Sequence, residues 1–277
     1  MLCFPNAKIN LGLHITSKRS DGYHTIETIF YPIPLTDALE AVNSEKTSLT
    51  QSGIKLDSSP EDNLVMKAYS LMHKKYNIPP LDIYLNKAIP SGAGLGGGSS
   101  DAAFTLKLLN DLCECNIGDD KLEKMAALIG ADCPFFIRNT PVIATGTGNI
   151  FKPSGISLKG YTLYLVKPPV AVSTKEAYSN IKPQKPDFSL NKLPSLSISE
   201  WKDVLKNDFE PGIFKKYPVI GEIKDKLYSM GAEYAAMSGS GSAVFGLFKD
   251  PEASGLTKNT ISSSIFSDCF IWKGVLE

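Results

Sequence analysis

The sequence has 277 residues, of which 43 % are hydrophobic and 21 % charged, as in a globular protein with a sizeable core. Its 29 basic and 29 acidic residues give a formal net charge of zero, which gives no support to binding of nucleic acid or an acidic membrane surface. The N-terminus lacks the basic start of a signal peptide, and no apolar run approaches the ~20 residues that cross a bilayer. We therefore expect a cytoplasmic protein, with reduced and mostly buried cysteines, that binds neither nucleic acid nor membrane. We also expect a monomer or weak homodimer, and no feature of the sequence decides between the two.

Two strands joined by a polar turn are predicted near the N-terminus. Apolar and polar residues alternate over residues 7–14, which is typical of a half-buried strand. Lys8 and Asn10 then share one face, which is either a solvated face or part of a site. Residues 23–31 form the second strand, and the Asp-Gly pair at 21–22 fits a hairpin turn.

The next segment leads from turn-rich strands to a glycine-rich stretch. Residues 34–60 are strand-like with little visible chemistry. Asp62 or Asn63 is suited to cap a helix that begins near Leu64. Residues 81–85 alternate as a strand that ends just before the glycines.

Residues 90–101 contain five glycines between this strand and a helix-like run. Glycine reaches backbone angles closed to other residues and lets a ligand approach the main chain. Ser99, Ser100 and Asp101 are good N-cap residues for the helix that follows. Because free N–H groups at a helix N-terminus bind anions, the stretch predicts a cradle for nucleotide phosphates.

Other readings of this stretch fit less well. A P-loop requires a lysine at its end, and none is present. Gly92, Gly94 and Gly97 match the Rossmann spacing, but no second strand follows at the right distance. A flexible linker or a close-packed turn is the remaining alternative, although a linker rarely lies between an apolar strand and a capped helix.

A second candidate position is Asp132. An amphipathic helix is predicted over residues 121–129, and Gly130 is suited to end it. Asp132 follows among apolar residues, where a carboxylate is costly to bury unless it is paired. It is therefore either a helix-capping residue or a functional acid.

The rest of the chain predicts further mixed structure. Residues 141–148 form a strand and turn, residues 182–200 a loop, and residues 220–230 a helix. Strands at 234–237 and 243–248 flank a serine–glycine loop, and a last helix and a strand at 269–272 finish the chain. The order predicts two α+β domains, at residues 1–155 and 156–277.

Four motifs resemble those of the GHMP kinases, the family of galactokinase, homoserine kinase and mevalonate kinase. Pro90-x-x-x-Gly94-Leu-Gly-Gly-Gly-Ser99-Ser-Asp-Ala-Ala103 resembles their phosphate loop, and Gly130-Ala-Asp132-x-Pro134-Phe-Phe136 their catalytic-aspartate motif. Asn207-Asp-Phe-Glu210 and the loop at 238–242 are similar to two later markers. The resemblance implies a ribosomal-protein-S5-like N-terminal domain, a ferredoxin-like C-terminal domain and an active site in the cleft between them.

The N-terminal signature is similar to that of one GHMP member, which phosphorylates the 2-hydroxyl of a cytidylyl sugar alcohol in the non-mevalonate route to isoprenoids. It reads Pro5-x-Ala7-Lys8-Ile-Asn10, followed by Arg19-x-Asp21-Gly22-Tyr23-His24. The resemblance implies that Tyr23 and His24 recognise cytosine by stacking and hydrogen bonding. Tyr178 is then expected over the base opposite Tyr23, or is simply a surface tyrosine.

The resemblance also implies a role for each site residue. Asp132 acts as general base, and Lys8 keeps it ionised and stabilises transferring charge. Asn10, Tyr23, His24 and Tyr178 bind the acceptor, and Mg²⁺, whose protein ligands are not assigned, bridges the phosphates. ATP is held by Pro90, Ser91, Gly92, Ala93, Gly94, Leu95, Gly96, Gly97, Gly98, Ser99 and Ser100, with Ser238, Gly239, Ser240 and Gly241 near the phosphates.

Three rival functions remain at this level. Another GHMP kinase would share the loop but has no reason for the Asp-Gly-Tyr-His run near residue 23. A Rossmann dehydrogenase would bind NAD. A non-catalytic nucleotide or sugar sensor would be expected to lose Lys8 or Asp132, and both are present.

Overall fold

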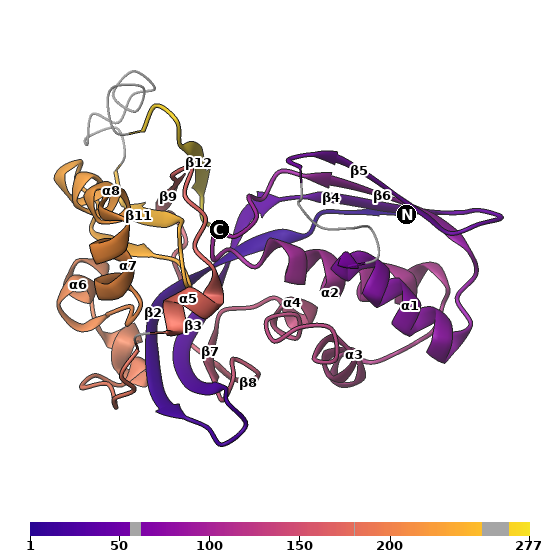
Figure 1. Ribbon diagram of the computed structural model, residues 1–277, viewed down its shortest axis with the longest axis horizontal. Coiled ribbons are helices and arrows are strands. Elements are labelled where there is room, and N and C mark those ends of the chain that lie inside the picture. Colours follow the sequence, from indigo (N-terminus) through magenta and orange to yellow (C-terminus); the bar gives the residue numbers. More distant parts are fainter. Residues whose placement is uncertain (56–61, 180, 251–265) are drawn as a thin grey trace. The chain divides into compact units, whose positions relative to one another are not determined.

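The computed structural model describes residues 1–55, 62–179, 181–250 and 266–277 (Figure 1). The chain forms two compact units. One contains residues 1–8, 35–91 and 96–140, and the other residues 9–34, 92–95 and 141–277. Because both units are discontinuous, a single cut after residue 155 does not describe the packing. As a boundary between domains it stays a prediction.

The first unit is built on a four-stranded sheet with the order β1–β4–β6–β5. Its strands are β1 (Leu2–Cys3), β4 (Ala38–Asn43), β5 (Ser48–Gly53) and β6 (Leu81–Lys87). β4 pairs antiparallel with β1 and β6, whereas β5 runs parallel to β6. Every second residue of β6 is buried, beginning with Leu81, so one face of this strand points into the core, as its alternating sequence predicts.

Helices α1 (Leu64–Tyr76) and α2 (Gly97–Leu112) run along one face of this sheet (Figure 1). The Asn63 side chain caps α1 by accepting a hydrogen bond from the Val65 N–H at 2.9 Å, as expected. α2 begins earlier than predicted. Its N-cap is Gly96, so the predicted capping residues at 99–101 lie inside the helix and make no cap. The glycines before them are therefore part of the helix start.

Two shorter helices complete the first unit. α3 (Asp119–Ala126) ends three residues before the predicted end at residue 129, because the chain leaves the helix in a turn. α4 (Phe135–Arg138) follows the segment that carries Asp132. Arg138 donates to Glu123 of α3 at 2.7 Å, so an ion pair links α3 to α4.

Most residues of the sheet with the order β2–β3–β7–β8 belong to the second unit, whereas residues 6–8 of β2 and 35–36 of β3 belong to the first. Its strands are β2 (Asn6–Lys18), β3 (His24–Thr36), β7 (Val142–Thr145) and β8 (Ile150–Pro153). The prediction of a half-buried β2 is wrong, because residues 7–15 are all buried. Leu13 and Ile15 pack into the hydrophobic core of this unit. The Asn10 side chain instead binds Thr28, so the polar face of the strand is enclosed and hydrogen-bonded.

The second sheet of this unit has the order β12–β9–β11–β10, and every pair is antiparallel. Its strands are β9 (Thr162–Lys167), β10 (Tyr234–Met237), β11 (Val244–Phe248) and β12 (Phe270–Val275). In chain order this is 4-1-3-2, the ferredoxin-like arrangement. The α+β fold class is therefore confirmed. The last predicted helix, before residue 269, lies outside the described residues.

Helices of the second unit pack on this sheet and around its ends. α8 (Pro218–Ser229) follows α7 (Glu210–Lys216) and packs against β10 and β11 (Figure 1). α5 (Thr174–Tyr178) is capped by Ser173, whose side chain accepts from the Glu176 N–H at 3.1 Å. The predicted loop at 182–200 contains two 3-10 helices, Leu190–Ser195 and Ile198–Glu200, and leads into α6 (Trp201–Val204). Leu190 and Leu193 of the first 3-10 helix and Ile198 of the second are buried, so apolar contacts hold both helices.

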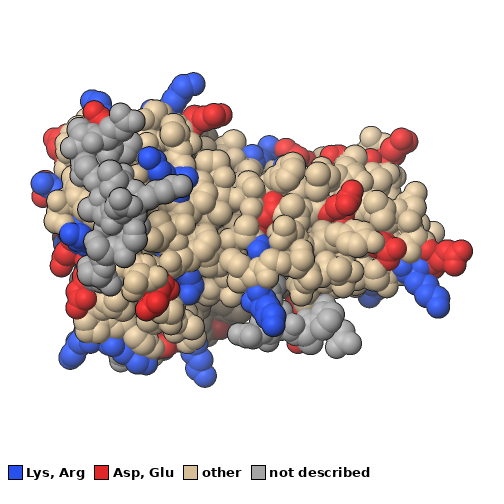
Figure 2. Space-filling model, turned by 90° about the horizontal axis from the view of Figure 1, so that it is seen from above, with Lys and Arg blue, Asp and Glu red and all other residues tan. Residues whose placement is uncertain are grey.

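Acidic and basic side chains are interspersed on the face shown in Figure 2, without a large area of one sign. This agrees with the balanced composition. Among the described residues, no helix combines the length and the apolar character that a bilayer span requires.

Candidate active site

The glycine-rich stretch adopts backbone angles that its sequence requires. Gly92, Gly94 and Gly96 have φ values of +58°, +73° and +71°, in the left-handed region that favours glycine. A Cβ at Gly94 would lie 1.9 Å from the Ser238 carbonyl oxygen, and one at Gly96 would lie 2.9 Å from the Phe136 ring. A Cβ at Gly92 would meet no atom within 4 Å. Gly94 and Gly96 are thus required for space as well as for conformation.

The start of α2 has the properties of an anion site. Its N-cap, Gly96, supplies no side-chain cap, and the first N–H groups of a helix have no partner within the helix. The Ser100 hydroxyl is buried and has no hydrogen-bond partner within the described part of the chain. Backbone N–H groups and the helix dipole together favour a bound phosphate at this end.

Lys8 and Asp132 lie together in the first unit. The Lys8 Nζ is 3.8 Å from Oδ2 of Asp132, with 4 % of the lysine side chain and 35 % of the aspartate side chain exposed. Burial lowers the pKa of Lys8, and the charge of Asp132 opposes this. A Cβ at Gly96 would lie 3.3 Å from Lys8 Cε. The lysine therefore lies between the start of α2 and a carboxylate that solvent can reach.

Asn10 and the serine–glycine loop meet in the second unit. The Asn10 backbone N–H donates to Ser238 Oγ at 3.3 Å, and its side-chain amide donates to Thr28 Oγ1 at 3.0 Å. Ser238 Oγ in turn donates to the Gly94 carbonyl oxygen at 2.9 Å. The loop at 238–242, predicted from the resemblance to lie near the phosphates, thus contacts the glycine-rich stretch directly.

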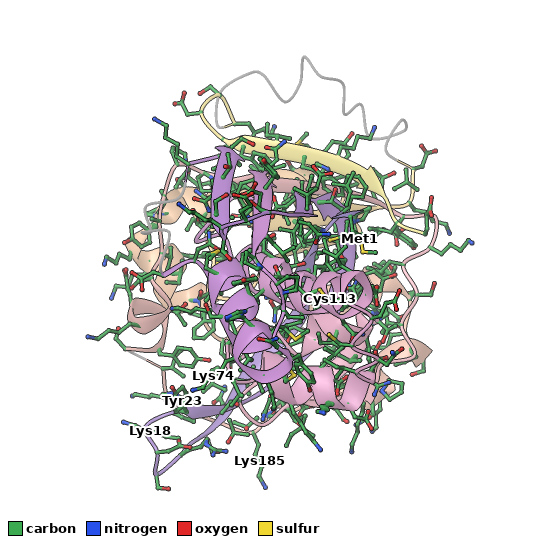
Figure 3. The ribbon with its side chains drawn as sticks, turned by 90° about the vertical axis from the view of Figure 1, so that its right-hand side faces the viewer. Met1, Lys18, Tyr23, Lys74, Cys113 and Lys185 are labelled. Atoms are coloured by element: carbon green, nitrogen blue, oxygen red, sulfur yellow. The ribbon has the colours of Figure 1, made fainter. Side chains whose placement is uncertain are left out.

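The predicted cytosine-binding residues form an aromatic group in the second unit. His24 and Tyr178 are stacked, with ring centroids 4.9 Å apart and planes at 22°, and Phe209 contacts the Tyr178 ring edge-on at 4.8 Å. The centroid separation is that of direct contact, so no base fits between these two rings. Tyr23 lies near Lys18 at the β2–β3 turn (Figure 3), with 66 % of its surface exposed. The structure therefore pairs Tyr178 with His24 rather than with Tyr23.

The cysteines do not add a nucleophile to the site. Cys133 is buried beside Asp132, and burial raises the pKa of its thiol to about 11. The other four cysteines are only half-buried, so the expectation of mostly buried thiols is wrong.

Comparison with known proteins identifies the family. The family model "GHMP kinases N terminal domain" matches residues 63–140, and "GHMP kinases C terminal" matches residues 192–263. The chain is 61 % identical over 277 residues, all of both chains, to a protein of Parabacteroides distasonis named 4-diphosphocytidyl-2-C-methyl-D-erythritol kinase. It is 55 % identical to a protein of that name from Bacteroides thetaiotaomicron, over 98 % of both chains.

The chain belongs to the GHMP kinase family. It is a small-molecule kinase, as the motifs indicate. A crystal structure of 4-(cytidine 5'-diphospho)-2C-methyl-D-erythritol kinase matches with a TM-score of 0.82 and 30 % identity, over 100 % of this chain and 99 % of that one. Streptococcus pneumoniae phosphomevalonate kinase in complex with phosphomevalonate and AMPPNP matches with a TM-score of 0.67 at 14 % identity, over all of both chains, which shows a shared fold.

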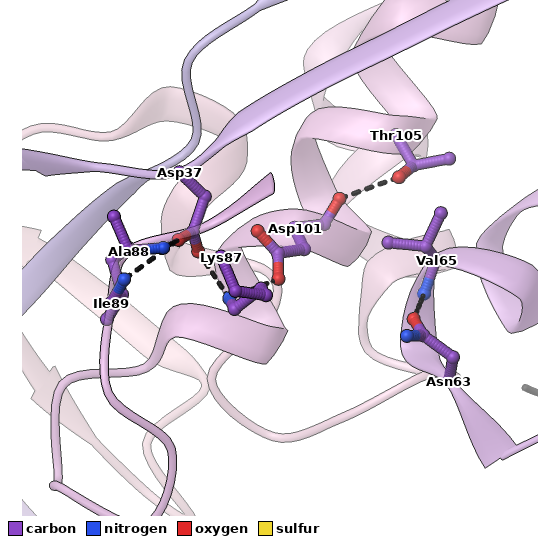
Figure 4. Close-up of polar contacts among 8 residues, drawn as sticks. All are labelled: Asp37, Asn63, Val65, Lys87, Ala88, Ile89, Asp101 and Thr105. Carbon is purple, nitrogen blue, oxygen red and sulfur yellow. Dashed lines mark hydrogen bonds and ion pairs between the residues drawn. The ribbon is translucent and has the colours of Figure 1, made fainter. Parts of the chain in front are cut away.

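The buried ion pairs of Lys87 in this GHMP kinase were not predicted from the sequence. It is 3 % exposed and donates to the carboxylates of Asp37 and Asp101, the latter at 2.6 Å (Figure 4). Asp37 Oδ1 also accepts from the backbone N–H groups of Ala88 and Ile89, at 2.6 and 2.8 Å. These contacts join the strand end before the glycine-rich stretch to the helix after it.

The Asp101 carboxyl is buried next to both a basic and an acidic side chain. Burial raises its pKa to about 7, with Lys87 opposing and Asp37 reinforcing the shift. Its Oδ1 has no hydrogen-bond partner among the described residues. The burial of Lys87 could have been predicted from the alternation of β6. Lys87 lies six residues after Leu81, so both side chains point to the buried face of the strand.

Proposed function

We propose that this GHMP kinase transfers the γ-phosphoryl group of ATP to the 2-hydroxyl of 4-diphosphocytidyl-2-C-methyl-D-erythritol. The products are the 2-phosphate and ADP, in the non-mevalonate route to isoprenoid precursors. The observation that carries the proposal is the full-length match at 61 % identity to a protein of that name. The pairing of Lys8 with a solvent-accessible Asp132 supports the chemistry.

Phosphoryl transfer depends on positioning and charge stabilisation more than on covalent catalysis. We propose that the backbone of residues 90–100 and the N-terminus of α2 hold the phosphates of ATP. The left-handed glycines and the uncapped helix start favour this role. Residues 238–241 support it by fixing the carbonyl of Gly94 through Ser238.

Asp132 is the proposed general base. Its carboxylate is partly exposed, so an acceptor hydroxyl can reach it and lose its proton as the phosphoryl group is transferred. Lys8 is the proposed electrostatic partner. Its ammonium group is almost completely buried, and a charge in such a site acts more strongly on nearby phosphate oxygens than it would in water.

The acceptor is proposed to contact Asn10, Tyr23, His24 and Tyr178. The exposed Tyr23 ring offers a face on which a cytosine can stack. His24 and Tyr178 are stacked on each other, so we propose that the base contacts the edges of these two rings. Phe209 packs against Tyr178 and limits its movement.

Mg²⁺ is the proposed metal. The described residues contain no cluster of three or more His, Cys, Asp or Glu side chains that could hold a metal ion. We propose that the Mg²⁺ ion is carried by the nucleotide phosphates with several waters, and that Ser99 or Ser100 in the first turn of α2 would contact it. The ion would neutralise phosphate charge during transfer.

The remaining proposals concern the context of the enzyme. The balanced charge supports a protein that binds neither nucleic acid nor an acidic membrane surface. A cytoplasmic monomer or weak homodimer stays a proposal. A domain boundary near residue 155 falls between the two matched family models.

The deciding experiment measures ADP release by the purified protein with ATP and Mg²⁺. Four acceptors are compared: the cytidylyl substrate, mevalonate, homoserine and galactose. Turnover with the cytidylyl substrate alone is expected. Turnover with another acceptor alone would overturn the substrate, and ATP binding without any turnover would favour a nucleotide sensor.

A further inference from the structure

The Asn-Asp-Phe-Glu run at 207–210 has no part in the chemistry proposed above, yet two of its side chains bind the backbone of residues 237–239. Asn207 is 4 % exposed, and its amide donates at 2.9 Å to the carbonyl oxygens of both Met237 and Gly239. Its Oδ1 accepts from the Phe209 N–H at 3.0 Å, which fixes the orientation of the amide. All the hydrogen-bonding atoms of this side chain face the protein interior.

Glu210 completes the contact with the same segment. Its Oε1 accepts from the Met237 N–H at 2.9 Å, and its Oε2 binds Lys224 Nζ at 2.6 Å. Both backbone polar groups of Met237 are therefore held by the 207–210 run. Met237 is the last residue of β10 and directly precedes the serine–glycine loop.

The loop passes this constraint to the glycine-rich stretch. Ser238 Oγ donates to the Gly94 carbonyl oxygen at 2.9 Å, and a Cβ at Gly239 would lie 3.2 Å from the Cα and the carbonyl oxygen of Gly94. Gly94 has room for no side chain, because its own Cβ would overlap the Ser238 carbonyl. The two loops are thus in backbone contact, and the position of one determines the position of the other.

We propose that Asn207 is a positioning residue for ATP, which acts through Ser238 to hold Gly94 in its phosphate-binding conformation. The inference rests on the proposed role of residues 90–100 in binding ATP. Without the Asn207 amide, two buried carbonyls lose their donor and the 237–239 segment loses its fixed position. ATP binding is then weakened, whereas Lys8 and Asp132 are unchanged.

The test compares Asn207→Ala, Ser238→Ala and the double variant in the full chain. The affinity for AMPPNP with Mg²⁺ is measured by calorimetry, and KM for ATP and kcat by ADP release. Each single variant is expected to raise Kd and KM by about 10-fold at little change in kcat, the loss expected for one to two hydrogen bonds. Asn207 holds the residues on both sides of Ser238, and Ser238 binds the Gly94 carbonyl, so the two side chains form one chain of contacts to Gly94. The double variant should therefore bind AMPPNP no more weakly than the weaker single variant.

Asn110→Ala is the matched control. Asn110 also makes two hydrogen bonds to backbone, with the N–H and the carbonyl of Ile117, and both residues belong to the first unit. It should lower the thermal midpoint without changing Kd for AMPPNP. If Asn207→Ala also lowers only the midpoint, or if its effect multiplies with that of Ser238→Ala, the inference is wrong.

Two further outcomes are decisive. If Asn207→Ala does not fold, Ser238→Ala alone tests the link to Gly94: a raised Kd supports it and an unchanged Kd overturns it. If the wild-type protein fails to bind AMPPNP, the proposed function fails and this inference fails with it. If instead the wild-type protein binds AMPPNP and the variants bind it equally well, only the role of Asn207 is wrong, and the proposed function stands.

Discussion

The Nζ atom of Lys8 lies 3.8 Å from Oδ2 of Asp132, and the two side chains differ sharply in exposure, at 4 % and 35 %. Lys8 comes from strand β2, and Asp132 from the turn before α4. The lysine is therefore a fixed, buried charge, whereas the aspartate is available to a substrate. This difference agrees with the roles proposed for the two residues, electrostatic stabilisation for Lys8 and proton transfer for Asp132.

Replacing the proposed base should remove turnover but preserve nucleotide binding. Asp132→Asn keeps the size of the side chain and loses its ability to accept a proton, so kcat should fall by about 10²- to 10⁴-fold. Kd for AMPPNP should stay close to that of the wild type. Asp120→Asn, at an exposed aspartate that binds Arg138, is the control and should keep full activity. Wild-type kcat in Asp132→Asn would exclude Asp132 from the chemistry.

The pH dependence of turnover should report on Lys8. Burial lowers the pKa of Lys8, so the ammonium group loses its proton at a lower pH than an ordinary lysine. Because the charged form is the one that stabilises phosphate, kcat should fall as pH rises through this lowered pKa. Lys8→Met should have a low kcat without this alkaline fall, measured as kcat against pH at saturating substrates. An unchanged alkaline limb in Lys8→Met would assign it to another group.

The exposed ring of Tyr23 should determine binding of the cytidylyl substrate. Stacking of a base on an aromatic ring contributes ~1–3 kcal/mol, so Tyr23→Ala should raise KM for that substrate by about 5- to 100-fold. KM for ATP should not change. Tyr84→Ala, at a tyrosine of β6 that is 44 % exposed, is the matched control. Equal KM values in the two variants would rule out stacking on Tyr23.

Two glycines of the same stretch should differ in their tolerance of a methyl group. Gly92 and Gly94 both have positive φ, but only at Gly94 does a Cβ overlap backbone, 1.9 Å from the Ser238 carbonyl oxygen. Gly94→Ala should therefore abolish tight binding of AMPPNP, and Gly92→Ala should weaken it only through strain, which costs ~1–2 kcal/mol. Calorimetry on both variants checks this. Similar Kd values would show that steric contact with Ser238 does not matter.

Asp101 should make the stability of the protein depend on pH. Its pKa is about 7 in the folded protein, against 3.8 for an ordinary aspartate, so between these values the folded state holds a proton that the unfolded state releases. The free energy of unfolding should thus fall as pH rises from 4 to 7, by on the order of a few kcal/mol, and level off above. Asp101→Asn should lack this fall in urea denaturation, whereas the exposed Asp225→Asn should keep it. An identical fall in Asp101→Asn would assign it to other groups.

Features that depend on short stretches of chain could be predicted from the sequence. The glycines of residues 90–98 imply left-handed backbone and a helix start, because few other residues adopt these angles. The alternation of β6 and the Asn63 cap of α1 were readable for the same reason, since spacing and capping are local properties. Four ordered motifs were enough to indicate the GHMP family, which the comparisons confirm.

Contacts between residues far apart in the sequence could not be predicted in this way. Lys87 with Asp101, Asn207 with Gly239, and His24 with Tyr178 are pairs that no spacing rule predicts. The burial of the polar face of β2 was missed for the same reason. A periodic pattern shows that one face of an element must be covered, but it does not show what covers the other face. That depends on the packing of remote segments, whose free energy is shared among many contacts.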